Sequence, residues 1–124
     1  NGIEVNFKET EFYKGKYLAF IDVTIPQGYL NGIDSIYMKP SDFSAKLDGK
    51  DVAAGQIQVT YGGVPWSEVS DSGLRTYSGD SRKFCIKVTG PAGASKLQVS
   101  YTFKYGEIEE TATAEGDVST KTAQ

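Results

Sequence analysis

Side chains alternate between apolar and polar along most of this chain, and this period of two constrains its fold more than any other feature. The longest run places Leu97, Val99, Tyr101, Phe103 and Tyr105 on one face of an extended segment, with polar residues between them. Successive side chains of a β-strand point to opposite faces, so the pattern predicts a strand with one buried face. Each of these side chains contributes roughly 1.5–3 kcal/mol when it is fully buried, so such a face requires a second apolar surface to pack against.

Further runs of the same kind recur at short intervals. They lie around residues 3–7, 17–25, 33–38, 43–47, 57–61, 84–88 and 108–114. Asp48-Gly49 follows one of them and is a strong hairpin signal, because a type I′ turn needs positive φ at both central positions. No window has a convincing helical period. We therefore expect an all-β fold, an antiparallel two-sheet sandwich of immunoglobulin-like or jelly-roll-like type with about eight strands.

The length of the chain fits one domain. Its 124 residues are close to the commonest domain size. We expect a single β-sandwich domain over residues 1–114, followed by a polar C-terminal tail or linker over residues 115–124, where small and polar residues predominate. No stretch approaches the ~20 apolar residues needed to span a bilayer, so membrane insertion is not expected.

The composition excludes several classes of function. The chain contains no histidine, which removes Ser-His-Asp and Cys-His catalysis and every His-ligated metal site. A formal net charge of −3 without any run of lysine or arginine disfavours nucleic acid as a partner, because phosphate binding needs a basic surface. A single cysteine rules out an internal disulfide and a zinc cluster. We therefore expect no enzyme activity, no metal and no cofactor.

Three groups of residues remain candidates for catalysis, metal binding or reactivity, and a structural role is the simpler interpretation of each. Glu107 and Glu109 would share a face of a strand and form a carboxylate pair for hydrolysis, or they are acidic residues that protect an edge strand from aggregation. Asp71 and Asp80 offer oxygen ligands for calcium without its sequence motif, and Asx-turns explain them equally well. Cys85 lies between two lysines that would lower its pKa, but a small strand residue is the simpler role.

The stretch from residue 61 to 82 is the strongest candidate for binding, because it is long for a connection between short strands. It carries five candidate ligand-binding residues: Tyr61, Trp66, Arg75, Tyr77 and Asp80. An aromatic ring covers the apolar C–H face of a sugar, while carboxylate, amide or guanidinium groups bind its hydroxyls. The same residue types are also enriched at protein interfaces. Alternatively, the indole of Trp66 closes one open end of the sandwich.

These observations favour a non-catalytic extracellular binding module, with polysaccharide as the preferred ligand. The alternative is an immunoglobulin-like structural or protein-interaction domain of a surface adhesin or of a phage virion or tail. Its partner would be a neighbouring protein domain docked on the apolar pair Leu18 and Phe20 or on an exposed edge strand. Both interpretations place the chain outside the cell, on the cell surface or in a virion.

Overall fold

The computed structural model describes residues 2–30, 32–33, 35–62 and 66–118. Within these ranges the chain forms eleven strands and two 3₁₀ turns, η1 (Pro40–Asp42) and η2 (Ala54–Gln56). The strands are β1 (Glu4–Tyr13), β2 (Lys16–Thr24), β3 (Ser35–Met38), β4 (Phe43–Leu47), β5 (Lys50–Asp51), β6 (Ile57–Tyr61), β7 (Ser67–Glu68), β8 (Leu74–Tyr77), β9 (Ser81–Thr89), β10 (Lys96–Tyr105) and β11 (Ile108–Asp117). None of the described segments is a helix long and apolar enough to cross a membrane.

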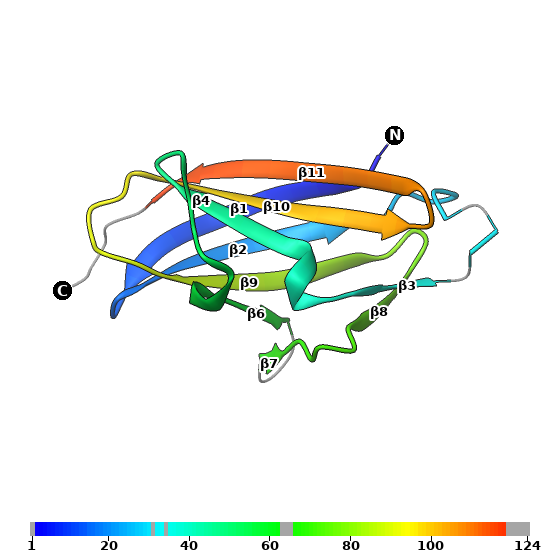
Figure 1. Cartoon of the computed structure of the whole chain (residues 1–124), viewed down its shortest axis with the longest axis horizontal. Coiled ribbons are helices and arrows are strands. Elements are labelled where there is room, and N and C mark those ends of the chain that lie inside the picture. The colour runs from blue at the N-terminus through cyan, green and yellow to red at the C-terminus, as the bar shows by residue number, and fades with distance from the viewer. Residues whose placement is uncertain (1, 31, 34, 63–65, 119–124) are drawn as a thin grey trace.

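The strands form two main antiparallel sheets and a short two-stranded ribbon (Figure 1). The first sheet has the order β1-β2-β9-β6-β7, and the second has the order β11-β10-β4-β5. The ribbon pairs β3 with β8. The expected all-β antiparallel sandwich is therefore confirmed.

The core lies between the facing surfaces of the two main sheets. Alternate residues of β2, β9 and β10 point inward and are almost completely buried: Tyr17, Ala19, Ile21, Val23, Phe84, Ile86, Val88, Leu97, Val99, Tyr101 and Phe103. Three aromatic rings join the sheets, because Phe43 of β4 packs against Phe84 of β9 at 5.0 Å and against Tyr101 of β10 at 5.1 Å between centroids. The period of two thus marks the buried face of β10 correctly as far as Phe103. The expected burial of Tyr105 is wrong: this side chain is 54% exposed, because it lies beyond the part of β10 that pairs with β4.

The structure contains more strands than the sequence pattern indicates, because three of them are too short to show a period. β5 and β7 have two residues each, and β8 has four. At the C-terminal side, β11 continues to Asp117, three residues beyond the expected strand end at Ala114. The ten residues of β10 pair with all ten residues of β11, so the long neighbour extends the strand. The tail residues 119–124 lie outside the described part of the chain.

A tight turn divides β3 from β4 and moves the chain from one sheet to another. Pro40 begins the turn η1, and the Asp42 carboxylate accepts the backbone N–H of Lys39 at 3.0 Å. The proline fixes its own φ and has no N–H to donate to a ladder, so a continuous strand cannot pass through this point. As a result, β4 pairs with β10, whereas β3 pairs with β8.

The loop between β9 and β10 is held from both main sheets. The buried Tyr17 hydroxyl of β2 donates to the carbonyl of Pro91 and accepts the N–H of Ala94 at 3.1 Å. From the other sheet, the Asp48 carboxylate accepts the N–H groups of Ser95 at 3.0 Å and Lys96 at 2.9 Å. Asp48 and the following glycine have φ of 48° and 84°, as the expected hairpin turn requires.

A second set of hydrogen bonds closes the side of the sandwich where β1 and β11 lie next to each other (Figure 1). One Glu110 carboxylate oxygen accepts the hydroxyl of Tyr29, and the other accepts the N–H of Ile3 at 3.2 Å. Burial, together with the hydrogen bond and the charge of Glu110, raises the pKa of Tyr29 to about 12. Glu110 thus joins the N-terminal segment, the loop after β2 and β11.

Candidate functional site

The candidate site lies on the outer face of the β3–β8 ribbon. In the antiparallel register of these strands, Tyr37 lies opposite Arg75, and Ser35 lies opposite Tyr77. Their neighbours Ile36 and Thr76 are buried, so the four residues point away from the core. We name Tyr37, Arg75 and Tyr77 the Tyr–Arg–Tyr cluster.

The guanidinium of Arg75 is fixed between the two tyrosine rings of the cluster. Its Cζ lies 5.2 Å from the centroid of Tyr77 and 5.9 Å from that of Tyr37. Its Nε also donates to the hydroxyl of Ser35 at 2.9 Å. Cation–π contacts of this length contribute about 0.5–1 kcal/mol each at exposed sites. The rings remain 49% and 44% exposed, so the cluster is both ordered and accessible.

The turn that follows β8 holds one end of this cluster in place. The Asp80 carboxylate accepts the backbone N–H of Tyr77 at 3.0 Å, and the Asp80 N–H donates to the Tyr77 carbonyl at the same distance. Behind the ribbon, Arg82 donates to the carbonyl of Arg75. Asp80 therefore has a positioning contact in the free protein, although this contact is not the Asx-turn that the sequence suggested, because the carboxylate accepts from a residue three positions earlier in the chain.

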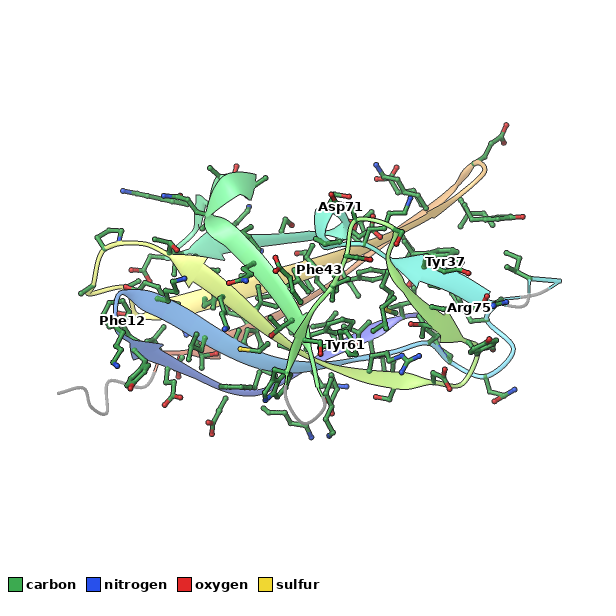
Figure 2. All side chains as sticks on the ribbon, turned by 90° about the horizontal axis from the view of Figure 1, so that it is seen from below. Phe12, Tyr37, Phe43, Tyr61, Asp71 and Arg75 are labelled. Atoms are coloured by element: carbon green, nitrogen blue, oxygen red, sulfur yellow. The ribbon has the colours of Figure 1, made fainter. Side chains whose placement is uncertain are left out.

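The five residues that the sequence suggested for binding do not form one group. Arg75 and Tyr77 lie together, with Asp80 in the adjoining turn. Tyr61, however, ends β6 opposite the buried Phe84 and packs against the core. Figure 2 shows Tyr61 near the middle of the molecule, while Arg75 and Tyr37 lie side by side closer to one end.

Trp66 occupies a different surface, the outer face of the first main sheet. Its indole is 43% exposed and packs edge-on against Phe20, at 5.9 Å between ring centroids. It does not close an end of the sandwich, because Phe20 points away from the core side of β2. The Val64-Pro65 segment before it lies outside the described residues. Trp66 thus belongs to a separate aromatic pair.

Tyr37 belongs to the site but is not among the binding residues that the sequence suggested. Its only local signal is an outward position in a short alternating run that ends before Pro40. The run does not show which strand pairs with it. The partner strand β8 is also hard to recognise, because its inward-facing residues are not all apolar. The inward positions of β8 are Leu74 and the fully buried Thr76, so half of its inner face is polar. The interpretation of residues 61–82 as one long loop is therefore wrong.

The remaining chemical candidates have structural surroundings. Cys85 is buried, and this burial raises the pKa of its thiol to about 11, although the nearby Lys87 acts in the opposite direction. A thiol with a raised pKa is a poor nucleophile at neutral pH, because the thiolate is the reactive form. Cys85 therefore acts as a small residue that fills a sheet surface next to Phe20 and Thr60, its neighbours across the strands.

The acidic residues do not form the arrangements that the sequence left open. Glu107 lies in the turn before β11, whereas Glu109 lies on β11 opposite Lys104, so the two do not share a strand face. Asp71 also lies in a turn. Across the described ranges, no three histidine, cysteine or carboxylate side chains gather closely enough to hold a metal ion.

Comparison with other proteins adds no constraint to this geometry. No family model, curated protein or solved structure matches the chain.

Proposed function

We propose that this protein is a non-catalytic binding module whose Tyr–Arg–Tyr cluster binds polysaccharide outside the cell, on the cell surface or in a virion. The observation that supports the proposal is the pair of half-exposed tyrosine rings on either side of a guanidinium that Ser35 already holds. The absence of histidine from the sequence agrees with a role in binding.

The physical fit to a sugar follows from the two kinds of surface in the cluster. A tyrosine ring is flat and apolar on its face, and it loses little side-chain entropy when it becomes fixed, since it has two χ angles. The guanidinium of Arg75 still has terminal N–H groups that are free of hydrogen bonds to the described residues. These groups would donate to sugar hydroxyls, or as a bidentate pair to the carboxylate of an acidic sugar.

A second candidate function is that of a structural or protein-interaction domain of a surface adhesin or phage virion. Tyrosine and arginine are enriched at protein interfaces for the same physical reasons, and a neighbouring domain could cover this ribbon. The pair of Trp66 and Phe20 favours this candidate as a second exposed aromatic surface on another sheet. Under this candidate, the ligand of the cluster is protein.

Glycan arrays and affinity gels distinguish the two candidates. The test compares the unmodified protein with Tyr77→Ala and Arg75→Ala, and with Tyr13→Ala as a matched control, because Tyr13 is 53% exposed and lies on β1 outside the cluster. Loss of one stacking ring or of the guanidinium is expected to weaken glycan binding about tenfold, which corresponds to roughly 1.4 kcal/mol. The control is expected to bind as the unmodified protein does.

Two results would remove the saccharide proposal. One is that the unmodified protein binds no glycan, and the other is that all four proteins bind equally. Binding of a protein partner that Tyr77→Ala and Arg75→Ala abolish, in the absence of any glycan binding, would instead support the second candidate.

A further inference from the structure

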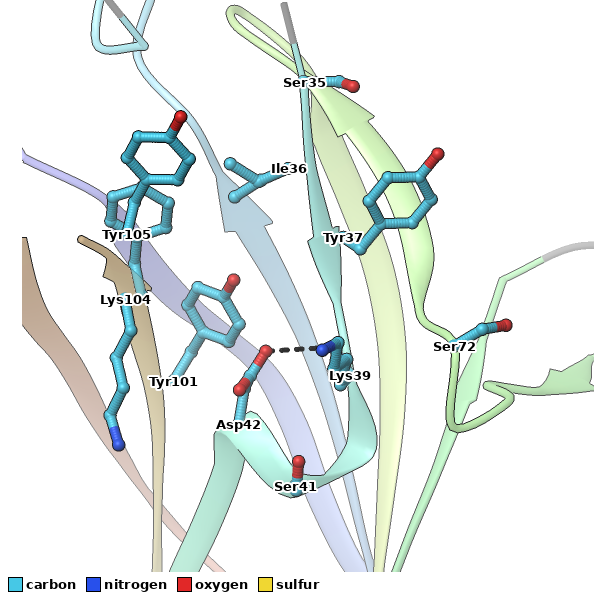
Figure 3. Close-up of a pocket in the computed structure, with 11 residues that line it drawn as sticks. Ser35, Ile36, Tyr37, Lys39, Ser41, Asp42, Ser72, Tyr101, Lys104 and Tyr105 are labelled. Carbon is cyan, nitrogen blue, oxygen red and sulfur yellow. Dashed lines mark hydrogen bonds between the residues drawn. The ribbon is translucent and has the colours of Figure 1, made fainter. Parts of the chain in front are cut away.

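A groove of about 680 Å³ lies between β3 and the end of β10, beside the Tyr–Arg–Tyr cluster (Figure 3). Its lining includes the inward-facing residues Ile36, Tyr101 and Phe103, with Lys39 and Lys104 among the exposed residues. The two walls therefore come from different sheets. Ser35 and Tyr37 of the candidate site also line the groove.

The groove exists because β10 is longer than the strand that pairs with it. β11 pairs with β10 over its whole length, but β4 pairs with it only from Leu97 to Tyr101. β4 begins at Phe43, opposite Tyr101, and the turn η1 before it connects β4 to β3, which does not pair with β10. The last four residues of β10, Thr102–Tyr105, thus have a strand on one side and none of the described strands on the other.

The direction of the unpaired backbone groups follows from the register. The N–H of Asp48 donates to the carbonyl of Lys96 at 3.0 Å, so the backbone groups of Lys96 point toward the β4 side of β10. In an antiparallel strand the groups that face one neighbour belong to every second residue. The N–H and C=O groups of Thr102 and Lys104 therefore point to the same side of β10, the side on which Lys104 lines the groove.

The volume suits a short extended chain. One residue of a strand in stacked sheets fills about 160 Å³, given a rise of ~3.4 Å, a strand spacing of ~4.8 Å and a sheet separation of ~10 Å. A groove of 680 Å³ thus has room for about four residues. Four is also the number of residues in the unpaired part of β10.

The side chains of the groove indicate which residues would fit. The buried Ile36, Tyr101 and Phe103 offer an apolar floor for every second side chain of an extended segment. The exposed Lys39 and Lys104 carry positive charge at the rim. The one carboxylate of the lining, Asp42, accepts the N–H of Lys39 and so has a partner in the free protein (Figure 3).

We propose that this groove binds an extended peptide segment of a partner protein, which adds as a strand to the unpaired edge of β10. About four residues of the peptide occupy the groove, and apolar side chains alternate with acidic ones. Backbone hydrogen bonds to Thr102 and Lys104 provide the register, as in other cases of strand addition. Ser35 and Tyr37 border both the groove and the Tyr–Arg–Tyr cluster, but this inference does not depend on saccharide binding, because it rests on the unpaired edge of β10.

The test uses a soluble acetylated and amidated hexapeptide of alternating valine and glutamate, with a valine–lysine hexapeptide for comparison. Titration of the isotope-labelled protein is followed by NMR amide shifts and hydrogen exchange. The valine–glutamate peptide is expected to shift and protect the amides of Thr102 and Lys104, and the valine–lysine peptide to bind about three- to tenfold more weakly. Lys104→Glu is expected to reverse this preference, whereas Lys50→Glu, an exposed lysine of the β4–β5 hairpin, leaves it unchanged.

N-methylation distinguishes strand addition from adsorption of an apolar peptide. One peptide is methylated on every valine nitrogen and a second on every glutamate nitrogen. Since one edge of a strand uses alternate residues, one of these peptides is expected to lose protection of Lys104 and the other to keep it. Equal binding by both methylated peptides would overturn the proposal, and so would shifts centred away from the residues that line the groove. The same protection at high protein concentration without peptide would also overturn it, and would assign the groove to a second copy of the chain.

Discussion

Replacing Tyr17 by phenylalanine removes one hydroxyl from a fully buried ring and leaves the ring itself unchanged. The hydroxyl makes two hydrogen bonds to the loop between β9 and β10, as donor to Pro91 and as acceptor from Ala94. A typical intramolecular hydrogen bond contributes about 1 ± 0.5 kcal/mol net. Water can reach the exposed Pro91 after the change, so part of the loss is recovered. We expect Tyr17→Phe to lower the free energy of unfolding by about 1.5 kcal/mol.

The loss corresponds to a measurable shift of the thermal midpoint. An unfolding entropy of ~2.1 cal/mol/K per residue over 124 residues gives a decrease in Tm of about 6 °C. Urea denaturation gives the same quantity at constant temperature. Tyr101→Phe is a matched control, because Tyr101 is equally buried and its hydroxyl makes no hydrogen bond to a described residue. We expect a loss below about 0.5 kcal/mol for the control, and equal losses for the two variants would refute the reasoning.

Three further predictions follow from the surroundings of single residues. Asp48→Ala loses both the carboxylate and the tolerance for positive φ, so it is expected to lower the free energy of unfolding by about 2 kcal/mol, against about 1 kcal/mol for Asp48→Asn. Urea denaturation measures both losses, and a smaller loss for alanine than for asparagine would contradict the prediction. Because the pKa of the Cys85 thiol is raised from 9.0 to about 11, the unfolded state releases this proton first, and stability is lost between pH 9 and 11 by up to ~1.4 kcal/mol per pH unit. Cys85→Ala should lack this part of the pH dependence, and identical slopes for the two proteins would be inconsistent with a buried thiol. Glu110→Gln is expected to lower the raised pKa of Tyr29, so that one tyrosine ionises earlier in an ultraviolet absorbance titration; an unchanged titration would exclude the contact.

The sequence predicts the sandwich because the alternation of apolar and polar residues is visible within each long strand. In β2 and β10, alternate residues are apolar over nine and ten residues, and these residues are buried except for Tyr105 at the end of β10. The hairpin at Asp48 was also predictable, since its backbone conformation is set by local chemistry. These features depend on neighbours in the sequence.

The site was only partly predictable, because it depends on which strands pair. Arg75 and Tyr77 are two residues apart in the chain, so their common face follows from the strand period once β8 is recognised. Tyr37 joins them through the pairing of β3 with β8, across a separation of about forty residues that no local pattern encodes. Trp66 is a candidate binding residue from its residue type alone, but in the structure it packs beside Phe20 on the first main sheet, away from the cluster. Pairing between distant short strands is therefore what the sequence did not show.

The most direct test of the central claim is a chemical-shift map of the labelled protein titrated with the glycan that binds best on an array. We expect the side-chain Nε–H signal of Arg75 and the amides of Tyr37 and Tyr77 to move together, with one dissociation constant, while the indole signal of Trp66 stays in place. Shifts centred on Trp66 and Phe20, with the Arg75 signal unchanged, would contradict this expectation.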